Sequence, residues 1–189
     1  FTYDKKGPDS VVKYPAEGVW YNGLATISGT AKDISSSVNK VELSIQDLTR
    51  GNTYWTGNDW THTEQWVEAS GTTDWTYTQG KLQDSTAWIS GHQYRVRPRA
   101  YDNRSPVNLS TGSWVGYYFD NTAPSSFVTK PVDKDYYNDG STMMATISGT
   151  ATDNTPAQGI LKSDVKVIQL LVQNESKKYW DGTYADAGG

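Results

Sequence analysis

A seven-residue segment occurs twice in this chain of 189 residues. Residues 25–31 read Ala-Thr-Ile-Ser-Gly-Thr-Ala, and residues 145–151 repeat the same sequence. An aspartate follows each copy at the second position after it, Asp33 in the first and Asp153 in the second. Self-similarity at a fixed spacing indicates consecutive copies of one structural module rather than a single large core.

The similarity extends beyond this segment in both directions. Pro8, Pro15, the hydrophobic alternation at 41–46 and the pair Tyr54-Trp55 correspond to Pro124, Pro131, residues 168–173 and Tyr179-Trp180. We therefore predict a complete module over residues 1–120 and a second, truncated module over 121–189. Phe1 to Asp4 match Tyr117 to Asp120, so we expect residues 1–4 to be the last strand of a preceding module in a longer array.

Apolar and polar residues alternate with period two in short segments separated by Gly, Pro, Asn, Asp and Ser. This pattern is typical of strands in an antiparallel sandwich. The fold class that we predict is all-β, with tandem sandwiches and no helix in the first module. The expected strands are residues 25–31, 41–46, 73–78, 94–101 and 114–119, with a hairpin of 53–56 and 63–67 around the turn at 57–59.

The expected strands imply particular neighbours. Ala25, Ile27, Gly29 and Ala31 are predicted to point inward and to leave room for Trp75. Glu42 is expected to face the same side as Arg95, Arg97 and Arg99 if their strands pair. Pro98 lies in the middle of a strand and cannot donate a ladder hydrogen bond. Either the strand is bulged at Pro98, or a neighbouring strand is missing there.

Several motifs together resemble one known family. They are Asp-Asn-Thr-Ala-Pro at 120–124, the duplicated segment, Gly-Thr-Thr-Asp-Trp-Thr-Tyr at 71–77 and Tyr-Arg-Val-Arg-Pro-Arg-Ala-Tyr-Asp at 94–102. In this order they resemble the tandem bacterial immunoglobulin-like (Big-type) repeats of large secreted and cell-surface proteins, including adhesins. The resemblance implies immunoglobulin-like sandwiches, in which Tyr94 bonds through its hydroxyl to nearby backbone. Residues 103–106 and the aromatic-rich stretch 54–66 depart from the family pattern.

Composition and motifs narrow the classes of function. The net charge of -4 and the pI near 5.1 argue against a nucleic-acid partner. No apolar run approaches the roughly 20 residues that span a bilayer, so we expect no membrane insertion in this segment. The chain has no cysteine and only His62 and His92, and it lacks the sequence motifs of hydrolases, metalloproteases and phosphate-binding loops. We therefore expect it not to be an enzyme.

The aspartates suggest a calcium hypothesis. In an immunoglobulin-like topology, Asp4, Asp33 and Asp102 lie in segments that meet at one end of the sandwich, and Asp120 and Asp153 repeat two of these positions. Ca²⁺ prefers six to eight oxygen ligands from such loops, and a bound ion would stiffen the joint between modules. The alternative is that these aspartates are ordinary turn formers that bond their own backbone.

The tryptophans suggest a second site. Aromatic residues make up 13% of the chain, which has eight Trp. Tyr54-Trp55 recurs in the second copy and is interpreted as structural, whereas Trp60 and Trp66 do not recur. These two are the candidate ligand-binding residues of a carbohydrate-binding platform.

The resulting expectation is a non-catalytic structural or adhesion repeat. It would form a stalk or spacer of a longer secreted or cell-surface bacterial protein, with adjacent modules as its first partners and a glycan or a host surface protein as further ones. A carbohydrate-binding module is one alternative. A fibre subunit that polymerises by strand exchange is another, although one donated strand would not complete the second copy.

Overall fold

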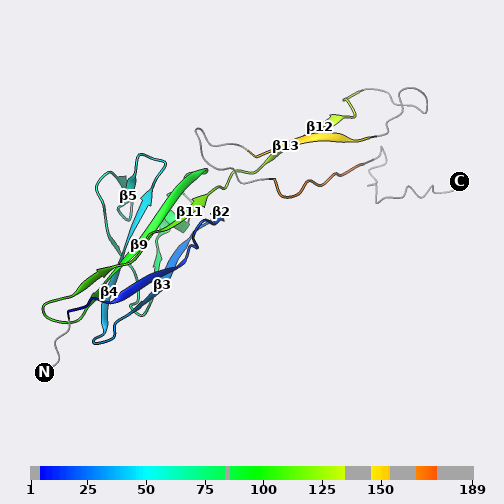
Figure 1. Ribbon diagram of the computed structural model, residues 1–189. Helices are drawn as coiled ribbons and strands as arrows, with labels where there is room; N and C mark the ends of the chain where they lie inside the picture. The colour runs from blue at the N-terminus through cyan, green and yellow to red at the C-terminus, as the bar shows by residue number, and fades with distance from the viewer. Residues whose placement is uncertain (1–4, 84–85, 135–145, 154–164, 174–189) are drawn as a thin grey trace. The chain divides into compact units, whose positions relative to one another are not determined.

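The computed structural model describes residues 5–83, 86–134, 146–153 and 165–173. The chain divides into two compact units: described residues up to Ala123 belong to unit 1, and those from Pro124 onward to unit 2. Both units are built from β-strands (Figure 1), as the alternating pattern predicts. The short helix α1 (Gly80–Gln83) in unit 1 was not expected. Within the described segments, no helix has the length and apolar character needed to cross a membrane.

Unit 1 consists of two facing sheets. The smaller sheet has the order β1-β3-β8, with strands β1 (Asp9–Tyr14), β3 (Thr26–Lys32) and β8 (Asp74–Thr78). The larger sheet has the order β2-β11-β9-β4-β5-β6, and β10 and β7 pair with β9 and β4. Its strands are β2 (Trp20–Tyr21), β4 (Val38–Asp47), β5 (Thr53–Trp55), β6 (Trp60–Thr61), β7 (Val67–Glu68), β9 (His92–Asp102), β10 (Leu109–Thr111) and β11 (Val115–Phe119).

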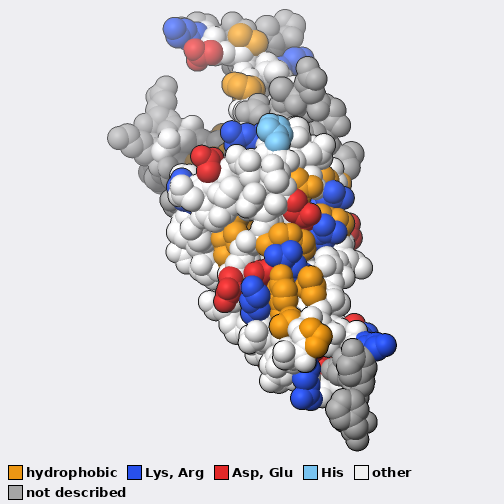
Figure 2. All heavy atoms as spheres, turned by 90° about the vertical axis from the view of Figure 1, so that its left-hand side faces the viewer, with side chains coloured by type: hydrophobic (Ala, Val, Ile, Leu, Met, Phe, Trp, Pro, Cys, Tyr) orange, Lys and Arg blue, Asp and Glu red, His pale blue; other side chains and the backbone are white. Residues whose placement is uncertain are grey.

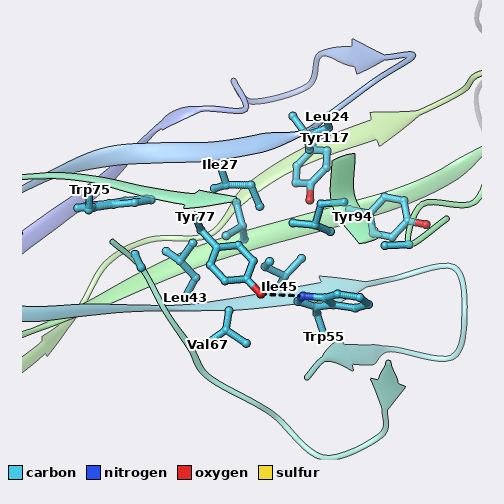
Figure 3. Close-up of a cluster of buried hydrophobic side chains, with 14 of the residues drawn as sticks. Leu24, Ile27, Leu43, Ile45, Trp55, Val67, Trp75, Tyr77, Tyr94 and Tyr117 are labelled. Carbon is cyan, nitrogen blue, oxygen red and sulfur yellow. Dashed lines mark hydrogen bonds between the residues drawn. The ribbon is translucent and has the colours of Figure 1, made fainter. Parts of the chain in front are cut away.

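The hydrophobic core lies between these sheets. In β8, and in β9 from Tyr94 onward, every second residue points inward and is buried, which is the period-two consequence of the pleat; in β4 the inward Val41, Leu43 and Ile45 are buried, and so are the outward Ser44 and Gln46. Figure 3 shows Leu43 and Ile45 of the larger sheet near Tyr77 of the smaller one. The indole nitrogen of Trp55 donates a hydrogen bond to the Tyr77 hydroxyl at 3.0 Å, so two large buried rings also satisfy their polar atoms. This arrangement is the all-β, sandwich-like fold predicted from the sequence.

Gly29 of β3 makes room for an indole ring, as expected. It lies opposite Trp75 in the β3–β8 register, and a Cβ added at Gly29 would overlap the Trp75 ring and the Val11 carbonyl oxygen. Ile27 and Ala31 are buried with it. The expectation for Ala25 was wrong, because this residue precedes β3 and is exposed.

The predicted hairpin closes differently. β5 pairs with β6, so that Trp55 lies opposite Trp60, rather than with residues 63–67. The backbone and hydroxyl of Thr56 bond the Asp59 carbonyl across the tight turn, which brings the chain back earlier than the sequence suggested. Val67 then returns to the larger sheet and pairs with Leu43 of β4.

Pro98 is accommodated by a break in its neighbour. β9 pairs with β4 without a register shift from Val41 to Asp47, so the strand is not bulged at Pro98. On its other side, β11 pairs with residues up to Val96 and β10 with residues from Arg99 onward. The missing N–H of proline therefore faces the interruption between two strands, where Gly112 N–H still donates to the Pro98 carbonyl.

Tyr94 forms the backbone contact that the resemblance implied. Its side chain is fully buried, and its hydroxyl oxygen accepts a hydrogen bond from the Ile89 N–H at 2.8 Å. Burial, together with the nearby Asp47 carboxylate, raises the pKa of Tyr94 well above its usual range. The hydroxyl therefore stays protonated and fixes the turn that leads into β9.

Unit 2 contains a two-stranded sheet of β12 (Ser125–Lys130) and β13 (Ser148–Thr152). Its register parallels that of β1 and β3: Val12 lies opposite Gly29, and Val128 lies opposite Gly149. A register shift follows at the next step in both pairs, before Tyr14 and before Lys130. Residues 168–173, the predicted counterpart of residues 41–46, are described but form no strand, and only residue 173 takes part in an isolated bridge.

Candidate functional site

The outer face of the larger sheet gathers cationic and aromatic side chains. In β9, Val96, Pro98 and Ala100 point into the core, so the alternate residues point outward and are half-exposed. The register sets Arg95 opposite Gln46, Arg97 opposite Ser44 and Arg99 opposite Glu42. This confirms the expected pairing of the two strands and the common side of Glu42 and the arginines.

Glu42 is the hydrogen-bonding centre of this face. Its carboxylate accepts from Arg99 Nε at 2.6 Å, from Lys40 Nζ at 2.7 Å and from the Tyr101 hydroxyl at 2.9 Å. Burial works against the charged form and raises its pKa, but the three donated hydrogen bonds outweigh burial and hold the pKa of Glu42 below its ordinary value. The carboxylate is therefore ionised and ties two cations to the sheet.

Three aromatic rings alternate with these cations. The guanidinium carbons of Arg95 and Arg97 lie 4.2 and 4.4 Å from the centre of the Trp114 ring. Arg99 lies 4.0 Å from the Trp66 ring, and Lys40 Nζ lies 4.5 Å from the Tyr101 ring. Contacts of this length are attractive because a cation meets the negative face of the ring.

We call this surface the arginine–aromatic ladder. It consists of Lys40, Trp66, Arg95, Arg97, Arg99, Tyr101 and Trp114. Figure 2 shows a face of the molecule on which Lys and Arg side chains lie among hydrophobic and acidic ones.

The charges on the ladder do not fully cancel. Glu42 pairs with Arg99 and Lys40, and Glu64 pairs with Arg97 at 2.7 Å. Burial raises the pKa of Glu64, but the hydrogen bond from Arg97 and further donors keep it below its ordinary value. Arg95 instead donates to the Gln46 amide oxygen at 2.6 Å. The ladder therefore has one guanidinium whose charge no carboxylate among the described residues balances directly.

The two candidate tryptophans occupy different environments. Trp66 belongs to the ladder and is half-exposed. Trp60 packs against the core: its ring centre lies 5.3 Å from Trp55 and 5.7 Å from Tyr94, and its Nε1 donates to the Ala87 carbonyl at 3.2 Å. The structure therefore does not bring Trp60 and Trp66 into one platform. Trp55 is buried in the core, as its recurrence in the second copy suggested.

Asp33 directly follows β3 and Asp102 is the last residue of β9, and each carboxylate bonds to the loop that comes after it. Asp33 Oδ1 accepts from the N–H groups of Ser35 and Ser36 at 2.8 and 2.5 Å. Asp102 accepts from the N–H and the side-chain amide of Asn108, both at 2.8 Å. Burial raises the pKa of Asp102, but these hydrogen bonds outweigh it and lower the pKa below its ordinary value. Such bonds are those of turn-forming aspartates.

The remaining aspartates of the calcium hypothesis are only partly described. Asp120 Oδ1 accepts from the Ser90 hydroxyl at 2.6 Å and from Thr122 N–H at 3.0 Å. Asp153 follows β13, and Asp4 lies outside the described residues. In the parts of the chain that are described, no group of three or more His, Cys, Asp or Glu side chains has a metal-binding arrangement. The oxygens of Asp33 and Asp102 fit a loop-capping role better than a preformed calcium cage, and calcium stays a prediction.

The histidines have separate surroundings. His62 is exposed, whereas His92 Nδ1 lies 2.9 Å from Oδ2 of the buried Asp47. Asp47 Oδ1 also accepts from the N–H groups of Thr49 and Arg50, so it caps the turn after β4. This His–Asp pair therefore has a role in the fold.

Sequence reasoning missed Trp114 as a member of the surface cluster. Trp114 lies one residue before β11, in the break between β10 and β11 beside Pro98. Only the sheet register places its ring against the guanidinium groups of Arg95 and Arg97. The sequence signal for this surface cluster was the alternation of Arg95, Arg97 and Arg99. Three outward cations on one strand require neighbouring side chains that balance their charge or cover them.

Comparisons with known proteins add little to this geometry. No family model matches the chain, and no curated protein matches it. Among solved structures, the crystal structure of an engineered protein resembles 59% of this chain at 13% sequence identity, with a TM-score of 0.35. The matched region is 20% of that engineered chain, so this chain covers only a small part of it. A likeness this weak carries no argument about function.

Proposed function

We propose that this chain is a non-catalytic structural repeat: consecutive immunoglobulin-like modules that form a stalk or spacer in a secreted or cell-surface bacterial protein. The observation that carries the proposal is the shared register of β1–β3 and β12–β13. Val12 and Val128 face equivalent glycines, and a register shift follows at the same step. Two segments that pair alike, at positions set by a sequence repeat, are what stacked copies of one module would give.

The strand order of unit 1 supports the immunoglobulin-like part of the proposal. β1, β3 and β8 form one sheet, while β4, β9 and β11 form the centre of the other. β1 belongs to the smaller sheet, and β2, the next strand, pairs in parallel with β11 of the larger one. A first strand divided between both sheets of a sandwich agrees with the immunoglobulin-type arrangement of two packed sheets.

The exit from unit 1 supports a spacer role. After β11, Asp120 N–H donates to the Tyr21 carbonyl, and Asn121 N–H donates to the Ser90 hydroxyl. The same Ser90 hydroxyl lies 2.7 Å from the Thr122 hydroxyl. These bonds hold the chain against unit 1 for several residues, so a force applied at this end acts on the folded sandwich and not on a long loose linker.

Single-molecule force spectroscopy tests this role. With the full chain held at its two ends, unit 1 is expected to resist until it opens in one step, with a lengthening of roughly 3.6 Å for each residue released, and to refold when the force is relaxed. Gradual extension without a discrete step for unit 1 would show that this unit does not resist force as a folded module.

The arginine–aromatic ladder favours a second function, the binding of an acidic polysaccharide. Trp66 and Trp114 offer half-exposed rings, and Arg95 has no carboxylate as its direct partner among the described residues. A sugar carrying carboxylates satisfies both kinds of group, because guanidinium forms paired hydrogen bonds with carboxylate. This chemistry differs from that of a platform for neutral sugars, since cations already cover ring faces here.

Titration of tryptophan fluorescence tests this second function. Polygalacturonate is expected to change the emission of the full chain, a neutral glucan of similar length is not, and 1 M salt is expected to weaken the effect. Arg95→Gln is the informative variant, because it removes the charge that no described carboxylate balances directly. An equal response to the neutral glucan, or a response that Arg95→Gln leaves unchanged, argues against acidic-glycan binding.

A further inference from the structure

We propose that Arg95, Gln46 and Glu17 form a recognition site for one uronic acid residue of an acidic polysaccharide. In this site, Arg95 binds the carboxylate of the sugar, and Glu17 accepts hydrogen bonds from its hydroxyl groups. The inference rests on the acidic-polysaccharide binding proposed above, and it deepens that function by naming the groups that recognise a single sugar. It does not depend on the stalk role.

Arg95 differs from the other two arginines of the ladder in the part of its side chain that is in use. Arg97 and Arg99 each donate a hydrogen bond to a glutamate carboxylate. Arg95 donates through Nε to the amide oxygen of Gln46 at 2.6 Å, and within the described residues its terminal Nη1 and Nη2 groups donate no hydrogen bond. Paired N–H groups of a guanidinium bind a carboxylate with two parallel hydrogen bonds. Arg95 therefore has a free carboxylate-binding edge.

Two contacts hold the Arg95 guanidinium in place before a ligand arrives. Gln46 is only 2% exposed, and its Nε2 donates to the Asn52 carbonyl at 3.3 Å, so its amide oxygen is turned toward Arg95. On the other side, the guanidinium carbon lies 4.2 Å from the centre of the Trp114 ring. A group that is already ordered loses less conformational freedom on binding. Gln46 is thus a positioning residue, because it acts on the ligand only through Arg95.

Strand β11 presents no side chain directly opposite Arg95. The register sets Gly116 opposite Arg95, and Gly116 is half-exposed. Its neighbours Val115 and Tyr117 belong to the core side of the strand, so the outward side of Gly116 faces the same way as Arg95. The nearest atoms to a Cβ added at Gly116 belong to Glu17, whose Oε1 would lie 3.2 Å away. A carboxylate therefore borders this position from the side opposite Arg95.

Glu17 determines which kind of anion fits. Its Oε2 accepts from the Gly116 N–H at 2.6 Å, whereas its Oε1 accepts no hydrogen bond within the described residues. Glu17 forms no ion pair with Arg95, although both residues are described. A ligand with carboxylates on all sides is repelled by Glu17, and one without hydroxyl groups leaves Oε1 unused. A uronic acid has one carboxylate and several hydroxyl donors, so it satisfies both residues.

The first test is isothermal titration of the full chain with trigalacturonate, comparing the unmodified protein with Arg95→Lys. Lysine keeps the positive charge but lacks the planar pair of donors, so the affinity is expected to fall by at least about tenfold. Arg50→Lys is the matched control. Arg50 is exposed in the turn after β4 and is not part of the ladder, so this change is expected to leave the affinity unchanged.

A second variant tests the positioning role of Gln46. Gln46→Glu gives Arg95 a carboxylate partner within the protein, which competes with the sugar, and the affinity is again expected to fall by at least about tenfold. Gln83→Glu makes the same change of charge at an exposed position of α1 and is expected to preserve binding. Each titration is made well below the melting temperature of the variant. A merely structural role of Gln46 would change that temperature and leave the affinity of the folded protein unaltered.

A change of ligand tests the role of Glu17. Tricarballylate carries three carboxylates, as trigalacturonate does, but it has no hydroxyl groups. The unmodified chain is expected to bind trigalacturonate more tightly than tricarballylate. Glu17→Gln removes the negative charge and keeps an oxygen that can accept from the Gly116 N–H, so it is expected to reduce this preference.

Five results would overturn the proposal: no binding of trigalacturonate, unchanged affinity in Arg95→Lys, unchanged affinity in Gln46→Glu, equal binding of tricarballylate, or a preference that Glu17→Gln leaves intact. The titration of the unmodified chain with polygalacturonate separates these failures from failure of the proposed function. If the polysaccharide still changes the tryptophan emission and Arg95→Gln weakens that change, acidic-polysaccharide binding stands and only the uronic acid site fails. If the polysaccharide has no effect, both fail.

Discussion

The substitution Gly29→Ala tests the central packing contact of unit 1. The new methyl group would overlap the Val11 carbonyl oxygen and lie 2.7 Å from Trp75 Cε2. Neither neighbour moves easily, because one is backbone in a paired strand and the other is a completely buried ring. Overpacking of this kind costs about 1–3 kcal/mol, and we take the upper end because two rigid groups are involved.

A smaller, opposing contribution comes from the unfolded chain. Replacing glycine by alanine restricts the unfolded state and stabilises a protein by about 0.4–1 kcal/mol where the backbone accepts it. Gly29 is in an ordinary strand, so this gain applies. The expected net loss is about 2 kcal/mol, which lowers the melting temperature of a domain of this size by roughly 8 °C.

The assay is calorimetric melting of the full chain, with urea unfolding followed by tryptophan fluorescence. Gly23→Ala is the matched control, because nothing lies within 4 Å of an added Cβ there and its φ is not positive. The double variant with Trp75→Phe is expected to be less destabilised than the sum of the two single changes, since the smaller ring relieves the overlap. Equal melting of Gly29→Ala and Gly23→Ala, or strict additivity with Trp75→Phe, would refute the packing argument.

Further predictions concern the hydroxyl of Tyr94, the ladder and calcium. Tyr94→Phe leaves the Ile89 N–H without its partner and is expected to lower the free energy of unfolding by about 1 kcal/mol in urea melts; no change would mean that water replaces the hydroxyl. Burial opposes the charge on Glu42, but donated hydrogen bonds hold its pKa below the ordinary value, so its stabilisation is complete above about pH 4.5 and is lost as the pH falls through the folded-state pKa. Glu42→Gln is therefore expected to be about 1 kcal/mol less stable than the unmodified chain at pH 7, with a gap that narrows in urea melts at pH 3; a gap that does not depend on pH contradicts this reasoning. If Asp33 and Asp102 contribute to a calcium site, Ca²⁺ raises the melting temperature of unit 1 relative to chelator, whereas an unchanged melting temperature excludes binding to the native state.

Local pattern was sufficient for much of the fold. Period-two alternation identifies the strands around Leu43, Trp75 and Val96 because the pleat itself sends successive side chains to opposite faces. The need for Gly29 opposite Trp75 could also be inferred, since a large ring requires a small partner. For Pro98, the sequence left two possibilities: a bulge in its strand, or a missing neighbour on one side. The reason is that proline has no N–H to donate to an adjacent strand.

The candidate sites were harder to predict, because their contacts join residues distant in sequence. Trp66 and Trp60 look alike in the sequence, yet the short β5–β6 turn folds Trp60 onto Trp55 and leaves Trp66 beside Arg99. The sequence also did not show which groups donate hydrogen bonds to the aspartate oxygens. Asp102, for example, accepts from the N–H of Asn108, six residues further along the chain.

By itself, the sequence determined that this is an all-β chain, which residues alternate toward a core, and that one segment occurs twice. Those properties depend on each residue and its near neighbours. Tertiary structure decided that Trp114, Trp66 and Tyr101 alternate with four cations on one sheet face, and that Gly29 is buried under an indole while Gly149 is exposed. The physical reason is that register and burial depend on which distant strand pairs with which, and identical local sequences such as residues 25–31 and 145–151 carry no record of their partners.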